Sequence, residues 1–125
     1  MVTKDTMVIT STKGHRIIQE IRTGDVVKTI AGNRKVVKTD RKKDDGVKLI
    51  FSDGFKVIAG NSCEFLLYPN IWKKAQYLEE GDLVAKPDNT FAKIVDITPL
   101  TEINFYILSI EDNGCYILSN GMAVR

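Results

Sequence analysis

Apolar and polar positions alternate in short runs along the whole chain, and few stretches show helical spacing. The runs are about four to six residues long and rich in Val, Ile, Thr and Phe, which predicts strands. Turn-forming groups that contain Gly, Asn or Asp separate most of them. We therefore predict an all-β chain with strands at Met7–Ser11, Val26–Ile30, Lys35–Thr39, Val47–Phe51, Phe55–Ala59, Phe65–Tyr68, Leu83–Lys86, Ala92–Ile97, Phe105–Ile110 and Cys115–Leu118.

Two stretches depart from the strand pattern. In Arg16–Arg22 and in Trp72–Leu78, apolar residues recur every three or four positions, which predicts one helical turn in each. Near the end of the chain, Asn120-Gly121 is a preferred turn pair because both residues tolerate positive φ. We expect Met122–Val124 to continue from this turn as a further extended stretch.

The chain contains an internal repeat. Gln19–Lys28 matches Gln76–Ala85 in pattern, 57 positions later, and Lys35–Val37 likewise resembles Lys93–Val95. Two copies are too few for a solenoid, so they predict a pseudo-two-fold pair of β-subdomains, with halves at about 1–61 and 62–125. Equivalent turns would then meet around the axis and leave a central cleft that holds both ends of the chain.

Composition and charge narrow the function classes. A chain of 125 residues with a net charge of +2 predicts one domain and a monomer, and shows no membrane-spanning apolar run. Basic residues cluster in Arg34–Lys48, but acidic residues interleave with them and Asp45-Gly46 is a turn signal. We interpret this segment as a solvated hairpin tip in preference to a nucleic-acid patch, since it lacks an aromatic stacking platform.

The chain has two cysteines, Cys63 and Cys115, and no signal peptide, so a reducing cytoplasmic setting is expected, with a disulfide as the less favoured alternative. His15 is the only histidine, which excludes a clustered His/Cys metal site. We expect neither a metal nor an organic cofactor.

Several segments, in this order, resemble the Hint fold of inteins and Hedgehog-type autoprocessing domains. Met1–Val8 has the layout of an intein start except at its first residue. Leu78–Val84, preceded by Trp72, resembles the segment after the second conserved intein block. Phe105–Glu111 and Cys115–Gly121 resemble the two C-terminal blocks, where Asn-Gly precedes the C-terminal splice junction. The resemblance covers nearly the whole chain and implies a horseshoe-shaped Hint domain.

The resemblance implies that the parent protein excises itself and ligates its flanking segments, the exteins, by intramolecular acyl transfer and Asn cyclisation. This is single-turnover autocatalysis without a cofactor. The chain has no room for a homing endonuclease, and the linker 87–91 lies where one would be inserted. Split inteins are commonly divided near this linker, so a complementary intein fragment is a further partner that the resemblance suggests.

Several positions that hold catalytic residues in the family hold other residue types in this chain. The first nucleophile must be Cys or Ser, whereas Met1 has an alkylated sulfur that forms no stable thioester. Met1 is either a start residue that replaced the nucleophile, by truncation or by design, or a natural loss. In the Thr-x-x-His block, Gly60 falls on the Thr and Cys63 on the His. Cys63 is either a weak proton donor or a small buried residue, and the neighbouring Asn61 can supply a hydrogen bond.

The C-terminal blocks also depart from the family. Ile107 stands where an assisting Asp is often found, and Gly114 where a His is common. Cys115 is adjacent and is either an internal acyl acceptor or, as we favour, a packing residue. Arg125 falls on the penultimate position and is either an oxyanion stabiliser or an exposed charge. We expect the cyclising Asn at the next position, so the chain as written would be unable to splice.

The sequence is also compatible with two alternative functions. One is a degenerate Hint-like module that binds or supports other proteins after losing its catalytic residues. The other is a Hedgehog-type autoprocessing domain, which would normally keep the Thr-x-x-His pair and transfer its ester to an external nucleophile.

Overall fold

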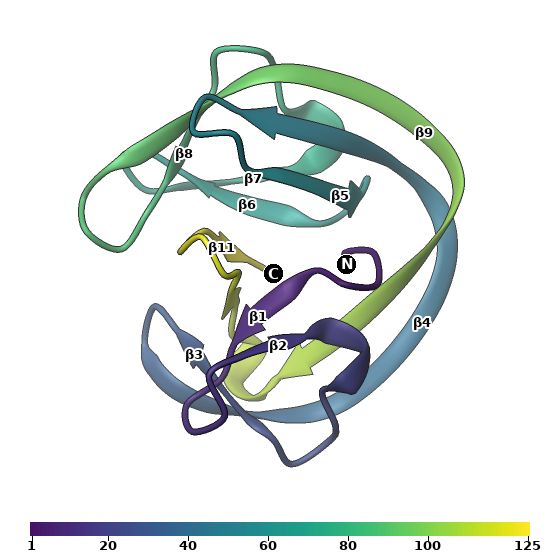
Figure 1. Cartoon of the computed structure of the whole chain (residues 1–125), viewed down its shortest axis with the longest axis vertical. Coiled ribbons are helices and arrows are strands. Elements are labelled where there is room, and N and C mark those ends of the chain that lie inside the picture. Colours follow the sequence, from purple (N-terminus) through teal and green to yellow (C-terminus); the bar gives the residue numbers. More distant parts are fainter.

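The computed structural model describes residues 1–125 and is built almost entirely of antiparallel strands, which confirms the predicted all-β class. The strands form two lobes linked by a pair of long curved strands, with both chain ends between the lobes (Figure 1). Three short 3₁₀ turns, η1 to η3, are the only helical elements. The elements are β1 Met7–Ile9, β2 His15–Ile17, η1 Ile18–Glu20, β3 Val26–Thr29, β4 Gly32–Phe51, β5 Lys56–Gly60, β6 Glu64–Leu67, β7 Ile71–Lys74, η2 Ala75–Tyr77, β8 Leu83–Ala85, β9 Phe91–Ile110, η3 Glu111–Asn113, β10 Tyr116–Ile117 and β11 Ala123–Val124.

The long strands β4 and β9 each span 20 residues and pair with one another along most of their length. The strands predicted at Lys35–Thr39 and Val47–Phe51 are both parts of β4, and those predicted at Ala92–Ile97 and Phe105–Ile110 are both parts of β9. The prediction of a solvated hairpin tip at Arg34–Lys48 is wrong, because this segment lies inside β4. Gly46 is not a turn residue: a Cβ there would fall 2.6 Å from the Phe105 ring and would also strike the Ala59 carbonyl oxygen. Glycine at this position allows a close approach of strands inside the ladder.

The internal repeat is visible in matching backbone hydrogen bonds. The N–H of Gly24 donates to Val36 O, and the N–H of Gly81 donates to Ile94 O, both at 2.8 Å. Both glycines have positive φ, 95° and 92°, which explains why Gly recurs at this turn. The turns η1 and η2 also begin 57 positions apart, inside the two stretches where one helical turn was predicted.

The two halves exchange their long strands. The first part of β4 pairs with β3 of its own half, whereas its last part and β5 lie in the lobe formed by β6, β7 and β8 (Figure 1). The strand β9 runs the opposite way, from its partner β8 into the lobe of β1 to β3. One cluster of 24 buried residues draws on both halves, so the core is shared between the lobes.

The short strands β2 and β7 were not predicted, because their three- and four-residue stretches mix charged and apolar residues. The division into halves at about 1–61 and 62–125 stays a prediction as a statement about domains. No helix in the structure has the length and apolar character that crossing a membrane requires.

Candidate functional site

The first residues of the chain form a short extended segment between β5 and β9. The carbonyl of Met1 accepts a hydrogen bond from the N–H of Gly60 at 2.9 Å. Val2 is fully buried and exchanges two backbone hydrogen bonds with Tyr106, at 3.2 and 2.8 Å. These contacts hold the backbone of residue 1 in one place.

The end of the chain is held as firmly. Val124 of β11 lies opposite Phe65 of β6. Arg125 exchanges backbone hydrogen bonds with Glu64, at 3.0 and 2.9 Å, and its Nε lies 3.2 Å from Glu64 Oε1. The guanidinium of Arg125 also stacks over the Trp72 ring at 4.1 Å. Such stacking on an aromatic face is a contact that Arg makes better than Lys.

The two chain ends therefore contact two consecutive residues, Cys63 and Glu64. The amino nitrogen of Met1 lies 3.6 Å from Cys63 Sγ, and Arg125 pairs with Glu64, the next residue. Figure 1 shows the two ends close together at the centre of the molecule. The structure thus brings the two chain ends together, as the repeat predicted.

A buried tyrosine completes the surroundings of the Met1 nitrogen. The Met1 amino group donates a hydrogen bond to the Tyr116 hydroxyl at 3.1 Å, and Tyr116 is only 1% exposed. Burial raises the pKa of the Tyr116 phenol well above its ordinary value, and the neighbouring Cys63 raises it further. The phenol is therefore neutral at physiological pH and keeps its proton.

The residues next to Cys63 shape the space around Met1. A Cβ on Gly60 would fall 2.6 Å from Met1 Cε, so the glycine makes room for the residue-1 side chain. The backbone N–H of Asn61 donates to Asp45 O at 3.1 Å, and its carbonyl accepts from Gln76 at 3.0 Å. Gly60 thus lies directly against Met1, and Asn61 next to it is held by its backbone.

Three other predicted positions of the C-terminal blocks, Ile107, Gly114 and Cys115, make no hydrogen bond with the Met1 nitrogen, whose side-chain partners are Cys63 and Tyr116. Cys115 is 4% exposed and packs in a small cluster with Ile117 and Ala123, which agrees with a packing role. Together with Gly114, Trp72 and Arg125, Cys115 lines a cavity of about 210 Å³ beside the chain end.

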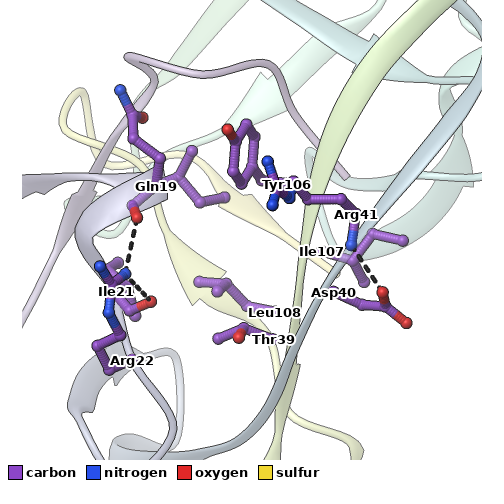
Figure 2. Close-up of a pocket in the computed structure, with 10 residues that line it drawn as sticks. Gln19, Ile21, Arg22, Thr39, Asp40, Arg41, Tyr106, Ile107 and Leu108 are labelled. Carbon is purple, nitrogen blue, oxygen red and sulfur yellow. Dashed lines mark hydrogen bonds between the residues drawn. The ribbon is translucent and has the colours of Figure 1, made fainter.

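Ile107 lines a different cavity, of about 500 Å³, between η1 and the paired strands β4 and β9 (Figure 2). Figure 2 shows Gln19 and Arg22 on one side of this space and Asp40 with Arg41 on the other. The Arg22 guanidinium donates to Gln19 O at 2.8 Å, so much of the polar lining is already paired.

Three residues of the site were not identified from the sequence: Tyr116, Glu64 and Trp72. Tyr116 lies in a predicted core strand, and its phenol oxygen was the one available signal, since a buried tyrosine hydroxyl usually needs a partner. Glu64 and Trp72 become relevant only through their contacts with Arg125, which joins residues far apart in the sequence.

The meeting point of the two chain ends combines three chemical features. It holds the backbone nitrogen of residue 1 against a thiol and a neutral phenol, and it holds the last residue through its backbone and its side chain. Nowhere in the chain do three or more His, Cys, Asp or Glu side chains gather as they would around a metal ion. Two chain ends held side by side in this way are suited to chemistry on the peptide bonds that would link the domain to flanking segments.

Comparison with known proteins identifies the fold. No family model matches the chain, and no curated protein matches it. Among solved structures, the gp41-1 intein matches with a TM-score of 0.87 at 21% identity, over 99% of this chain and 96% of that one. A DnaB intein from Synechocystis sp. PCC 6803 matches with a TM-score of 0.85 at 16% identity, over 98% and 95%.

A bacterial intein-like domain from Clostridium thermocellum also matches, with a TM-score of 0.83 at 16% identity, over 98% of this chain and 95% of that one. These matches span almost the full length of every chain compared. The chain therefore has the Hint fold of inteins, as its motifs implied.

Proposed function

We propose that this chain is a protein-splicing element, which excises itself from a precursor and joins the two flanking polypeptide segments. The observation that carries the proposal is the meeting of Met1 and Arg125 at Cys63 and Glu64. Excision with ligation requires the two scissile bonds to be close, because the acyl group must pass from one junction to the other. A fold shared with inteins over nearly its whole length supports the same function.

The proposed substrates are the peptide bond before Met1 and the bond after the residue that follows Arg125. At the first junction, Gly60 and Val2 hold the residue-1 backbone, and Tyr116 contacts its nitrogen. At the second, the backbone pairing of Arg125 with Glu64 fixes the position from which the following residue would continue. The acyl group would pass from the first junction to a thiol or hydroxyl side chain on the residue after an Asn at that next position. The Asn would then attack its own carbonyl with its side-chain amide and release the C-terminal segment, which now carries the acyl group.

The proposal extends to the context of the reaction. No cofactor takes part, because each step is an acyl transfer within the chain. A monomer suffices, since both junctions lie beside neighbouring residues of the same chain. We place the reaction in the cytoplasm, where Cys63 and Cys115, both free in the structure, would stay reduced. The loop between β8 and β9 is where a complementary fragment would begin if the chain were split.

The test is a tagged precursor with Met1→Cys, an Asn placed after Arg125, a Cys directly after that Asn to accept the acyl group, and a distinct tag on each side. Ligated tags, seen by mass, are the expected product, because Cys at position 1 supplies the acyl acceptor that methionine lacks. A matched precursor with Met1→Ala and Cys63→Ala, which has no thiol left beside the first junction, should yield no ligated tags. Absence of both ligation and cleavage in the Met1→Cys precursor would contradict the proposal.

A second candidate function is a scaffold or binding module of the same fold. It is favoured by the residues at the family's chemical positions, which are Met1, Gly60, Cys63, Ile107 and Gly114 in this chain. Under this alternative, the tagged precursor stays intact even with Cys at position 1 and Asn after Arg125. The same experiment therefore separates the two functions.

A further inference from the structure

Resting on the proposed function, we propose that Cys63 is the acyl acceptor at the peptide bond before Met1, and that Tyr116 supplies the proton to the departing Met1 nitrogen. The first junction would then be opened by an internal thiol, with no nucleophile required at position 1. The proposal rests on the position of Cys63 and Tyr116 around a single backbone nitrogen.

The sulfur lies at attacking range of the bond. Cys63 Sγ is 3.6 Å from the Met1 nitrogen. In a precursor, the carbonyl carbon of the preceding residue is bonded to this nitrogen at about 1.33 Å. The carbon is therefore within roughly 2.3–4.9 Å of the sulfur by geometry alone, a range that includes the ~3–3.5 Å of a near-attack arrangement.

Both partners of this contact are held by backbone hydrogen bonds. The N–H of Cys63 donates to Gly60 O at 2.9 Å, and its carbonyl accepts from Ala75 at 2.7 Å. The Met1 carbonyl accepts from the Gly60 N–H, also at 2.9 Å. Because Gly60 bonds to both residues, it fixes the sulfur and the scissile nitrogen relative to each other, which lowers the entropic cost of the step.

Other nucleophiles in the chain are placed less well. The Met1 sulfur is a thioether and forms no stable thioester. Cys115 packs against Ile117 and Ala123 beside the chain end, in a cluster separate from the one that contains Cys63. Cys63 and Tyr116 are the two side chains in hydrogen-bond contact with the Met1 nitrogen.

Tyr116 is suited to proton donation and not to nucleophilic attack. Its hydroxyl makes one hydrogen bond, to the Met1 nitrogen, and the side chain is otherwise enclosed. Its raised pKa keeps the phenol neutral, so it retains a proton to give. In the free chain the nitrogen donates to the phenol; as the peptide bond breaks, the nitrogen becomes the group that needs a proton.

The step balances in atoms and charge. The Cys63 S–H bond breaks, and a bond forms between Sγ and the carbonyl carbon of the preceding residue. The bond from that carbon to the Met1 nitrogen breaks, and this nitrogen takes the Tyr116 proton while the thiol proton returns to the phenol oxygen. The products are a thioester on Cys63 and a free amine on Met1, with no oxidation or reduction.

The test uses a precursor with its natural Met1, an N-terminal tag joined through a peptide bond, and Ala after Arg125 to prevent Asn cyclisation. Hydroxylamine cleaves thioesters, so it should release the tag as a hydroxamate of defined mass. Cys63→Ala should abolish this release. Cys115→Ala should leave the rate unchanged, and Tyr116→Phe should slow it by about 100-fold or more, the usual range for losing a general acid.

Folding is checked for each variant by the fluorescence of Trp72, the only tryptophan. The rate of the Tyr116→Phe variant is also measured against pH, because losing a proton donor changes the profile whereas a packing defect lowers the rate evenly. Tag release that persists in folded Cys63→Ala would overturn the thiol's role, and an unchanged rate in folded Tyr116→Phe would overturn the phenol's.

The result also separates this inference from the proposed function. If the Met1 precursor releases no tag while the Met1→Cys precursor with its added Asn splices, the Cys63 inference fails and the splicing function stands. If the Met1→Cys precursor also yields nothing, the splicing function fails as well. A thioester trapped on Cys63 by mass spectrometry of the peptide would support both.

Discussion

The packing of Met1 against Gly60 makes a stability prediction that can be worked from distances. In Gly60→Ala, the new Cβ would lie 2.6 Å from Met1 Cε, 2.8 Å from Sδ and 2.9 Å from Cγ. Carbon atoms pack best at about 3.5–4.0 Å, so the methionine must move by about 1 Å. Overpacking typically costs about 1–3 kcal/mol, and we expect about 1–2 because the Met1 side chain is flexible and only partly buried.

The measurement is a double-mutant cycle in one tagged precursor, which allows Met1→Ala to be made. Urea unfolding followed by Trp72 fluorescence should show the Gly60→Ala midpoint lowered by about 0.5–1 M, taking an m-value of about 2 kcal/mol/M. In the Met1→Ala background the clashing atoms are gone, and alanine also reduces the entropy of the unfolded chain. There the substitution should be neutral or stabilising, which gives a coupling of about 1 kcal/mol or more.

The coupling is the decisive quantity in this cycle. If Gly60→Ala costs the same with Met1 and with Ala at position 1, the loss comes from the β5 backbone and not from the contact with the Met1 side chain. If it costs nothing with Met1 present, the residue-1 side chain does not occupy the space above Gly60.

Three further predictions concern stability. Gly46→Ala should lower the unfolding free energy by at least about 2–3 kcal/mol in urea titrations, because the Ala59 backbone cannot move away from the new Cβ. A loss of unfolding free energy below ~0.5 kcal/mol would refute the close contact between the strands. Burial raises the pKa of Asp53, but hydrogen bonds from Lys86 and the Phe55 backbone outweigh it and hold the pKa below 3.8. This depressed pKa stabilises the fold above about pH 4, so Asp53→Asn should cost about 0.5–1 kcal/mol at pH 7 and close to nothing near pH 2; a pH-independent cost would argue against the ion pair. Arg125→Lys should lower the melting temperature by a few degrees, equivalent to about 0.5–1 kcal/mol, and change Trp72 emission; unchanged emission would contradict the stacking.

The turns and many of the strands could be predicted from the sequence because the residues within each of these segments determine its conformation. Gly24 and Gly81 need positive φ, and the repeat of their surroundings identified the two-fold arrangement. The long strands were missed for a physical reason. Asp45-Gly46 favours a turn locally, but pairing of β4 with β9 and β5 on its two sides outweighs that preference.

The site was predictable only in part. Gly60, Cys63 and Arg125 were found because the family resemblance assigns their positions, although their residue types differ from the family's. Tyr116 carries no local sign of its contact with Met1, since the two residues are brought together by the whole fold. Contacts of this sequence separation depend on topology, which residue patterns alone do not specify.

The exchange of β4 and β9 between the lobes has a consequence for the origin of the domain. Half a chain, ending near residue 61, would leave β4 without β9, its partner along most of its length, so it should not fold alone. Two identical copies could cover each other's exposed edges as a swapped homodimer. Gene fusion of such an ancestor would raise the effective concentration of its halves. The two fused halves could then acquire different side chains at the place where they meet.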